Sequence, residues 1–231
     1  MCMSMSAETE KRLAAERAVE MVTDGMVLGL GTGSTAAYAI RLLGERVAQG
    51  LQIRGVPTSE ATRTLARECK VPMVGLREAG RIHLTIDGAD EIDPQLRLIK
   101  GGGGALLREK IVAASSDCVV IIADASKVVQ QLGAFPLPVE VVPFGLPLAM
   151  REVEALGAKV TLRGGETAPF VTDEGHFILD CAFRRIEDAD GLAAKLNAIP
   201  GVVEHGLFIG LADRVIIGRH DEVRVFRRKK A

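Results

Sequence analysis

The chain has 231 residues, of which 48% are hydrophobic and 26% charged, as is usual for a soluble globular protein. Its 29 basic and 30 acidic residues nearly cancel, so charge gives no reason to expect nucleic acid or a membrane as partner. No apolar stretch reaches membrane-spanning length, and the first ten residues lack the apolar run of a secretion signal.

The first half of the chain predicts alternating helices and buried strands. Apolar residues recur at helical spacing over residues 11–21, 36–47, 59–69 and 104–115. Short apolar runs at 26–30, 51–56, 81–86, 96–99 and 118–123 predict strands. This alternation indicates an α/β fold with a doubly wound, mainly parallel, Rossmann-like sheet. Ligands of such sheets lie outside the carboxyl ends of the strands. Four residues are expected to meet at that edge: Gly31, Asp87, Lys100 and Asp124.

The pattern changes after Gln131. The proline-punctuated run 135–143 looks like a crossing between domains. Helices are then expected at 146–156 and 188–198, with short strands at 159–163, 170–172, 177–180 and after Gly201. The apolar runs 207–211 and 214–217 are expected to return to the first sheet. We therefore predict a Rossmann-like catalytic domain from residues 1–131 with 207–231, and a smaller α+β domain over residues 132–206.

A glycine-rich turn follows the first predicted strand. The pattern Gly-x-Gly-x-x-Ala at residues 31–36 matches a loose dinucleotide fingerprint. No carboxylate ends the second strand to hold a ribose, so an NAD site has little support. Thr32, Ser34 and Thr35 instead place hydroxyls beside the N–H groups of a helix start, which suits an anion or a polyol. The alternative is a plain strand–helix turn capped by Thr32 or Ser34.

A second glycine-rich segment is surrounded by charge. Asp87, Asp90 and two further carboxylates precede Lys100, a cation expected at the end of the neighbouring strand, and residues 101–104 are all glycine. Four glycines in a row are costly in conformational entropy and are expected where the backbone must approach a ligand closely. Two alternatives remain. The aspartates could form a turn beside Gly88, or they could bind magnesium, although no Gly-Lys-Ser/Thr phosphate loop accompanies them.

Glu109 is the most informative single residue. On a helix its neighbours three and four positions away are Ala105, Leu106, Val112 and Ala113. A carboxylate on an apolar face is expected to have a raised pKa, which suits a general base near neutral pH. The alternative is a glutamate paired with a base such as Arg108. Lys127, just past the strand at 118–123, offers a second cation at the same edge.

Cysteine and histidine supply no catalytic or metal-binding pattern. No two of the four cysteines are spaced as Cys-x-x-Cys, which argues against zinc and a disulfide framework and fits a reducing cytoplasm. None of the four histidines has ligand spacing to another histidine or to a cysteine.

Several ordered motifs together resemble the type A ribose-5-phosphate isomerases over nearly the whole chain. They are Gly31-Thr-Gly-Ser-Thr35, Asp87-Gly-Ala-Asp-Glu91, Lys100-Gly-Gly-Gly103, Arg108-Glu-Lys110, Ala123-Asp-Ala-Ser-Lys127, Phe135-Pro-Leu-Pro-Val-Glu-Val141, Ile199-Pro-Gly-Val-Val203 and Gly206-Leu-Phe208. The resemblance implies an aldose–ketose isomerase of the non-oxidative pentose phosphate pathway. It would interconvert D-ribose 5-phosphate and D-ribulose 5-phosphate through an enediolate, without metal or cofactor.

The resemblance also implies roles for individual residues. Glu109 would be the base that moves a proton between C2 and C1, and Lys100 would stabilise charge on the reacting oxygen. Asp87 would assist ring opening, and Asp90 would lie near the sugar hydroxyls. The substrate-binding residues would be Thr32, Gly33, Ser34, Thr35, Asp87, Gly88, Ala89, Asp90, Lys100, Gly101, Gly102, Gly103 and Lys127. The only ligand expected is a sugar phosphate, and the chain would form a homodimer or homotetramer.

Three other functions are less consistent with the residues. An amino-sugar phosphate deaminase would need a histidine beside its acids, and none occurs within residues 87–109. A CoA transferase would carry its glutamate in a different motif, usually in a longer chain. A sugar-phosphate sensor of a transcriptional regulator would carry a basic recognition helix, and none precedes Lys11.

Overall fold

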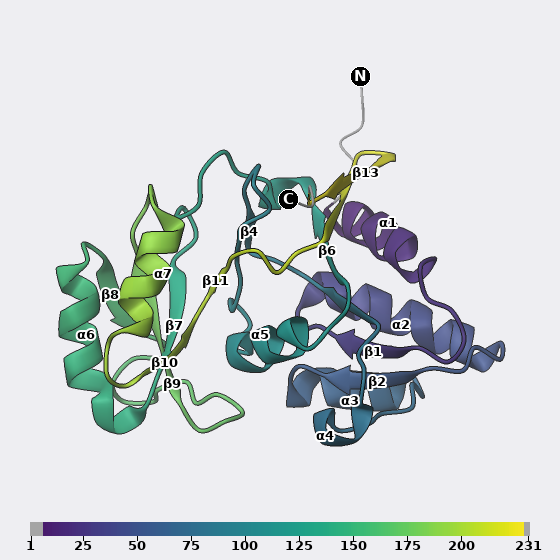
Figure 1. Ribbon diagram of the computed structural model, residues 1–231, viewed down its shortest axis with the longest axis horizontal. Coiled ribbons are helices and arrows are strands. Elements are labelled where there is room, and N and C mark those ends of the chain that lie inside the picture. Colours follow the sequence, from purple (N-terminus) through teal and green to yellow (C-terminus); the bar gives the residue numbers. More distant parts are fainter. Residues whose placement is uncertain (1–6, 229–231) are drawn as a thin grey trace. The chain divides into compact units, whose positions relative to one another are not determined.

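The computed structural model describes residues 7–228 (Figure 1). Cys2 and the start of the segment compared with a secretion signal lie outside the described residues, as do Lys229 and Lys230. The chain forms two compact units. The first unit comprises Met1–Ala89, Arg108–Val128 and Gly210–Ala231, and the second comprises Asp90–Leu107 and Val129–Ile209.

The first unit contains a six-stranded sheet in the order β13-β12-β6-β3-β1-β2. Its strands are β1 (Val27–Leu30), β2 (Arg54–Pro57), β3 (Leu84–Asp87), β6 (Val119–Asp124), β12 (Arg214–Arg219) and β13 (Glu222–Arg227). All neighbours are parallel except β12 and β13. This confirms the predicted parallel sheet and the return of residues 214–217 to it. The sequence reading did not predict β13, the antiparallel edge strand.

Helices cover both faces of this sheet. They are α1 (Ala7–Val19), α2 (Ser34–Ala48), α3 (Glu60–Glu68), α4 (Leu76–Ala79) and α5 (Leu106–Ala114). The predicted cap of α3 is confirmed, because Ser59 Oγ accepts a hydrogen bond of 3.0 Å from the N–H of Thr62. The first two residues of α5 belong to the second unit and the remainder to the first.

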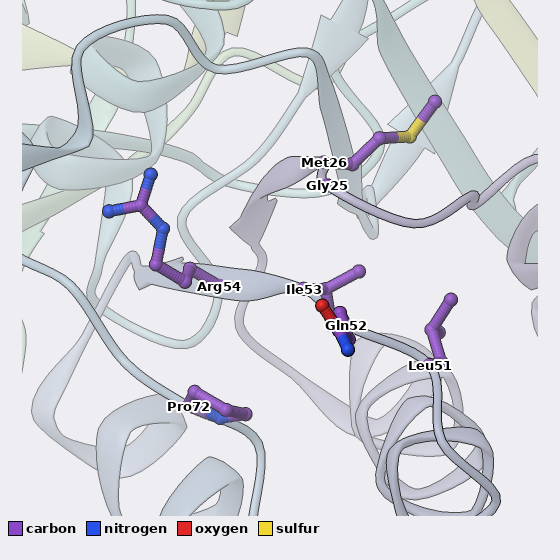
Figure 2. A pocket seen from close by; sticks show the side chains of 7 residues that line it. All are labelled: Gly25, Met26, Leu51, Gln52, Ile53, Arg54 and Pro72. Carbon is purple, nitrogen blue, oxygen red and sulfur yellow. The ribbon is translucent and has the colours of Figure 1, made fainter.

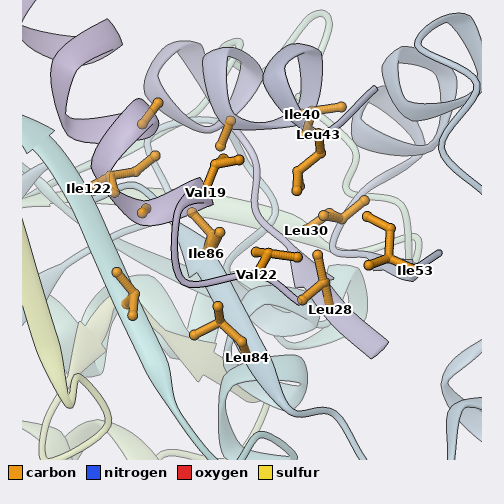
Figure 3. Packing of buried hydrophobic residues seen from close by; sticks show 14 of the residues in the cluster. Val19, Val22, Leu28, Leu30, Ile40, Leu43, Ile53, Leu84, Ile86 and Ile122 are labelled. Atoms are coloured by element: carbon orange, nitrogen blue, oxygen red, sulfur yellow. The ribbon is translucent and has the colours of Figure 1, made fainter. Parts of the chain in front are cut away.

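Side chains of β1 alternate between the two faces, as the period of a strand requires. Leu28 and Leu30 pack with residues of α1 and α2 in the main core (Figure 3). Val27 points to the opposite face, where it clusters with Val112 of α5. Gly29 shares that face, and a Cβ there would lie 2.6 Å from Val112 Cγ1. Glycine at position 29 therefore lets α5 lie directly against β1.

The second unit contains two antiparallel sheets. One has the order β10-β7-β9-β8 and is formed by β7 (Leu137–Val141), β8 (Lys159–Leu162), β9 (Phe177–Ala182) and β10 (Val202–His205). The other has the order β11-β5-β4 and is formed by β4 (Glu91–Ile92), β5 (Leu98–Ile99) and β11 (Leu207–Phe208). With α6 (Leu146–Ala155) and α7 (Ala189–Asn197), the unit is the α+β domain that the sequence predicted.

Its extent differs from the prediction in one respect. Residues 90–107, 129–131 and 207–209 belong to the second unit rather than to the first. The reason is strand pairing, because Leu98 and Ile99 of β5 pair with Phe208 and Leu207 of β11 and not with the parallel sheet. The expectation that Lys100 ends a strand of the parallel sheet, and that 207–211 returns to it, was therefore wrong.

The crossing predicted at 135–143 was also wrong in part. Its middle forms β7, a central strand paired on both sides. Pro136 and Pro143 flank the strand, and Pro138 lies beyond the residues that pair with β10. A proline at that position removes no hydrogen bond from this pairing, so the strand is compatible with it.

None of the helices within residues 7–228 is long and apolar enough to cross a bilayer.

Candidate active site

The topology of the first sheet marks one place for a ligand. Counted along the chain, its five parallel strands have the order 2-1-3-4-5, so the direction of chain winding reverses between β1 and β3. Ligands of open α/β sheets bind at the carboxyl ends of the strands beside this reversal. Gly31 and Thr32 follow β1, and Asp87 ends β3. The sequence and the topology therefore indicate the same edge.

Asp87 is held in a fixed orientation by the backbone. Its Oδ1 accepts hydrogen bonds from the N–H groups of Gly88 at 2.7 Å and Thr32 at 3.2 Å, and the residue is only 2% exposed. Gly31 is required here, since a Cβ would lie 2.1 Å from Asp87 Oδ1 and 2.6 Å from its Cα. The backbone after β1 thus lies directly against this carboxylate.

The hydroxyl of Thr32 is part of a cluster that the sequence reading did not foresee. Thr32 Oγ1 lies 2.8 Å from both Thr58 Oγ1 and Ser59 Oγ, and 3.1 Å from Thr62 Oγ1. Three hydroxyls from the end of β2 and the start of α3 therefore fix this side chain. The signal was present in the sequence as polar residues directly after the second strand, where a dinucleotide site would have an acid.

The other residues of the 31–35 loop begin α2. Gly33 is the N-cap, with a positive φ of 108° that favours glycine, so neither Thr32 nor Ser34 caps the helix. Ser34 is exposed and Thr35 is buried. The N–H groups of a first helical turn have no partner within the helix and carry the positive end of its dipole. This helix start can therefore bind an anion.

Glu109 lies on the sheet side of α5 and is only 4% exposed. The position of Glu109 along the strands can be estimated from Val112, because Val112 packs against Gly29 of β1. Helix α5 leads back toward the start of β6, so Glu109, one turn earlier, lies nearer the carboxyl edge by about 4.5 Å. This places the buried carboxylate at the height of the strand ends that carry Thr32 and Asp87. The neighbouring Arg108 Nη1 donates to Glu60 Oε1 at 2.9 Å.

The end of β6 lies at the same edge. Asp124 is buried there and accepts a 2.9 Å hydrogen bond from the N–H of Ser126. This begins the short 3-10 helix η1 (Ala125–Lys127), which ends in the partly exposed Lys127. The structure therefore places Lys127 at the edge that the sequence predicted for it.

The remaining predicted residues belong to the second unit, which begins at Asp90. Asp90 Oδ2 accepts a hydrogen bond of 2.8 Å from the N–H of Gly102. Lys100 is 2% exposed, and its Nζ lies 5.4 Å from the centre of the Phe208 ring. The backbone N–H of Lys100 donates to the carbonyl of Gly206 at 2.9 Å. The 100–104 loop is thus attached to its unit by its lysine and by Asp90.

Two of the four acids around residue 90 have structural roles. Glu91 accepts hydrogen bonds from the N–H groups of Gly133 at 2.7 Å and Phe135 at 2.6 Å. Asp93 accepts from the N–H and the guanidinium of Arg97, the latter at 2.6 Å. These contacts leave Asp87 and Asp90 as the candidates for chemistry.

The predicted residues are therefore distributed over two units. The first unit brings together Thr32, Gly33, Ser34, Thr35, Asp87, Gly88, Ala89, Glu109 and Lys127. The second unit brings together Asp90, Lys100, Gly101, Gly102 and Gly103. The chain joins the two groups covalently, because Ala89 and Asp90 are consecutive residues. Among residues 7–228, no group of three or more His, Cys, Asp or Glu side chains is placed to hold a metal ion.

A hollow of about 450 Å³ lies at the opposite edge of the first sheet (Figure 2). It is lined by Gly25, Met26, Leu51, Gln52, Ile53, Arg54 and Pro72. All of them except Pro72, which follows α3, precede β1 or β2 or lie at the start of β2, so the hollow is at the amino ends of the strands. The hollow contains one charged side chain and no acid–base pair, and it is not a candidate for catalysis.

Known proteins match the chain over nearly its whole length. The family model described as ribose 5-phosphate isomerase A (phosphoriboisomerase A) matches residues 54–222. Ribose-5-phosphate isomerase A of Bradyrhizobium diazoefficiens is 55% identical, covering 98% of each chain. The Methylorubrum extorquens protein of that name is 57% identical over 92% of this chain and 93% of its own.

Solved structures agree. A D-ribose-5-phosphate isomerase in complex with phospho-erythronic acid has a TM-score of 0.94 at 42% identity, covering 97% of this chain and all of its own. The Methanocaldococcus jannaschii ribose 5-phosphate isomerase A has a TM-score of 0.91 at 42% identity, covering 96% of this chain and all of its own. The chain therefore belongs to the ribose 5-phosphate isomerase A family.

Proposed function

We propose that the chain, which as a member of this family interconverts ribose 5-phosphate and ribulose 5-phosphate in the pentose phosphate pathway, does so through an enediolate with Glu109 as the base. One observation carries this assignment. Glu109 is a carboxylate buried on the sheet side of α5, at the height of the strand ends beside the topological reversal. A base in that position can reach a ligand bound at the carboxyl edge.

The proton and electrons balance over two steps. In the first step Glu109 removes the proton from C2 of the open-chain aldose, and the C–H electron pair forms the C1=C2 bond as negative charge moves to O1. In the second step the same proton, or one from solvent, is delivered to C1, while O2 becomes the ketone after its proton moves to O1. One carboxylate suffices because the enediolate is planar, so that a base lying on one of its faces can reach both C1 and C2.

Lys100 is the group that we assign to the charge on oxygen. It is a buried cation that directly precedes a loop of four glycines. A buried cation stabilises a developing oxyanion more than an exposed one does, because little water screens it. Asp87 is assigned to ring opening, where a fixed carboxylate can take the proton of the anomeric O1 hydroxyl and return it to O4 as the C1–O4 bond breaks. Asp90 is assigned to the sugar hydroxyls.

The N-terminus of α2 suits the phosphate group. Exposed Gly33 and Ser34 begin the helix, so its first N–H groups can be reached by an anion. Gly88, Ala89 and Lys127 lie at the same edge and complete the binding residues of the first unit. The phospho-erythronic acid bound to the solved relative is consistent with such a site, since it combines a phosphate with a planar carboxylate whose two oxygens can stand in for O1 and O2 of a planar enediolate.

Exchange with heavy water tests the mechanism. We expect the protein, incubated with ribose 5-phosphate and EDTA in D₂O, to introduce deuterium at C2 of the aldose and C1 of the ketose, as NMR would record. Conversion without any deuterium uptake, even after many turnovers, would contradict an enediolate whose base exchanges its proton with solvent. Loss of conversion on adding EDTA would contradict our proposal that no metal takes part.

We also propose that the chain acts in the cytoplasm as a homodimer or homotetramer. Cys69, Cys118 and Cys181 are free thiols, which suits a reducing compartment. Phe226 of the edge strand β13 is 45% exposed, as is typical of residues that cover one another in oligomers. Light scattering coupled to gel filtration would give the mass, and a monomer would contradict the proposal.

A further inference from the structure

We infer that Arg163 is a positioning residue that fixes the peptide units of the 100–104 loop. This inference rests on the proposed role of that loop in substrate binding. Arg163 follows β8 in the second unit, and nothing in its sequence neighbourhood associates it with the loop. Its side chain nonetheless makes the contacts that four consecutive glycines cannot make for themselves.

The guanidinium of Arg163 contacts two carbonyl groups of the loop. Its Nη1 donates to the carbonyl oxygen of Gly101 at 3.0 Å and to that of Gly102 at 3.2 Å. These are charge-assisted hydrogen bonds, which are stronger than those between neutral groups. The Gly101 carbonyl also accepts from the N–H of Gly104 at 2.9 Å, which closes the loop as a turn.

Arg163 is itself held in place from two sides. Asp180 of β9 accepts from its Nε at 3.0 Å and from its Nη2 at 2.5 Å, a two-pronged pair that fixes the plane of the guanidinium. The Arg163 side chain is 17% exposed, and its guanidinium lies 5.8 Å from the centre of the Phe170 ring. Because the acid lies on a strand, the donor is attached to a rigid element rather than to a mobile loop.

Phe170 contacts the loop as well. A Cβ at Gly104 would lie 2.5 Å from Phe170 Cζ, so the ring packs directly on this backbone. A turn at Gly164, whose φ is 80°, brings Phe170 back so that its N–H donates to the carbonyl of Arg163 at 2.8 Å. Arg163 and Phe170 therefore form one contact surface for the loop.

The contacts fix one peptide unit from both ends. The carbonyl of Gly101 and the N–H of Gly102 belong to the same planar peptide. Arg163 donates to that carbonyl, while Asp90 accepts from that N–H at 2.8 Å. Rotation of the peptide would break both hydrogen bonds at once. Arg163 thus acts through the peptide on the orientation of Asp90, to which we assign a substrate contact.

The second peptide has its carbonyl fixed in the same way. Arg163 binds the carbonyl of Gly102, and planarity then sets the direction of the Gly103 N–H. Gly103 is exposed. Glycine loses more freedom on ordering than any other residue, so an unfixed loop would have to be ordered by the substrate itself. Arg163 orders it beforehand.

Substitutions at Arg163 and Asp180 test this role. We expect Arg163→Ala to lower kcat/KM by about tenfold to a hundredfold, as a misplacement of about 1 Å at a site does. Arg163→Lys should have a kcat/KM close to that of Arg163→Ala. A lysine ammonium cannot make two parallel hydrogen bonds to Asp180 and also donate to two carbonyl groups. Asp180→Asn should give a smaller loss in the same direction. Arg185→Ala is the matched control, since that arginine is in the same unit and pairs with Glu187 while 70% exposed.

Two readouts separate positioning from general stability. Hydrogen exchange followed by mass spectrometry should show faster exchange in the peptide covering residues 100–107 in Arg163→Ala, with unchanged exchange in β9. Millimolar methylguanidinium should restore part of the lost kcat/KM in that variant, whereas urea should not. The inference would be overturned by kcat/KM within twofold of the parent chain in both Arg163 variants. It would equally be overturned by faster exchange throughout the unit without rescue.

These outcomes are distinct from failure of the proposed mechanism. Glu109→Gln should lower kcat by about 10²–10⁴-fold while leaving exchange at residues 100–107 unchanged. If Glu109→Gln remained active, the base would be misassigned, but a loop loosened by Arg163→Ala would still show the role of the arginine.

Discussion

The two glycine loops of the molecule are built alike but are stiffened differently. The 31–35 loop lies against Asp87, which accepts two backbone N–H groups, and the 100–104 loop is bound by Asp90, which accepts one. In the first loop the Asp87 carboxylate packs against a single glycine, Gly31. Strand β1 ends directly before this loop, and helix α2 begins within it. In the second, four glycines depend on Arg163 and Phe170 from a distant part of the chain.

The difference shows what each loop requires of its surroundings. The conformation of a loop at a strand–helix junction is restricted by the strand and the helix that it joins. A run of glycines lacks two such flanking elements and depends more on side chains that contact its backbone. Two aspartates only three positions apart in the chain thus organise loops in different units.

The largest effect is expected at Glu109 of the first unit. Glu109→Gln keeps the shape and removes the base, so kcat should fall by about 10²–10⁴-fold with a small change in KM. Steady-state kinetics on ribose 5-phosphate would measure this, with the exposed Glu68→Gln of α3 as the control. Near-normal turnover of Glu109→Gln would remove this residue from the mechanism.

A somewhat smaller effect is expected at Lys100 of the second unit. Lys100→Met retains the length of the side chain and its contact with Phe208 but removes the cation. Loss of one group that stabilises an oxyanion typically costs about 10²–10³-fold in kcat. Lys127→Met is the matched comparison, because that lysine is partly exposed and should affect KM more than kcat. A larger fall in kcat for Lys127→Met would reverse the two assignments.

Substitutions of Gly31 and Gly102 should have different effects, because a Cβ would meet a backbone atom at the first and a side chain at the second. Gly31→Ala would place a Cβ 2.6 Å from the Asp87 Cα, a backbone atom, and should reduce the free energy of unfolding by about 1–3 kcal/mol. Gly102→Ala meets Asp90 Oδ1 at 2.7 Å, the end of a side chain that can turn away. It should therefore lower kcat/KM more than stability. Urea unfolding with parallel kinetics would test the pair, and equal losses of stability would contradict the comparison.

The smallest effect is expected in the reactivity of the buried and partly buried cysteine thiols of the two units. Burial raises the pKa of the Cys181 thiol well above its ordinary value, and raises those of Cys118 and Cys69 as well. Only the thiolate reacts, so a group with a raised pKa stays unreactive until the pH approaches that pKa. In a Cys2→Ser background at pH 8, we expect a thiol reagent to modify Cys69 and Cys118 slowly and Cys181 only after unfolding. Rapid modification of Cys181 in the folded chain would show that its core opens.

Much of the candidate site could be predicted from the sequence because its signals are local. Apolar spacing placed Glu109 on the inner side of a helix, and the ends of buried strands placed Asp87 and Lys127 at one edge. Such signals extend over about one helical turn or one strand, and the residues that carry them are close together in the chain. The helix cap at Ser59 is predictable for the same reason.

Tertiary structure alone decided which distant segments meet. Lys100 follows a strand of two residues, and nothing within that strand specifies that its partner is Leu207–Phe208 rather than the parallel sheet. The hydroxyl cluster around Thr32 and the contacts of Arg163 with the glycine loop likewise join residues tens of positions apart. The sequence by itself therefore determined the helices and parallel strands around the site and the chemistry at their ends. The partners of the shortest strands and of the glycines depended on non-local packing, because so short a segment carries too few side chains to select a partner by itself.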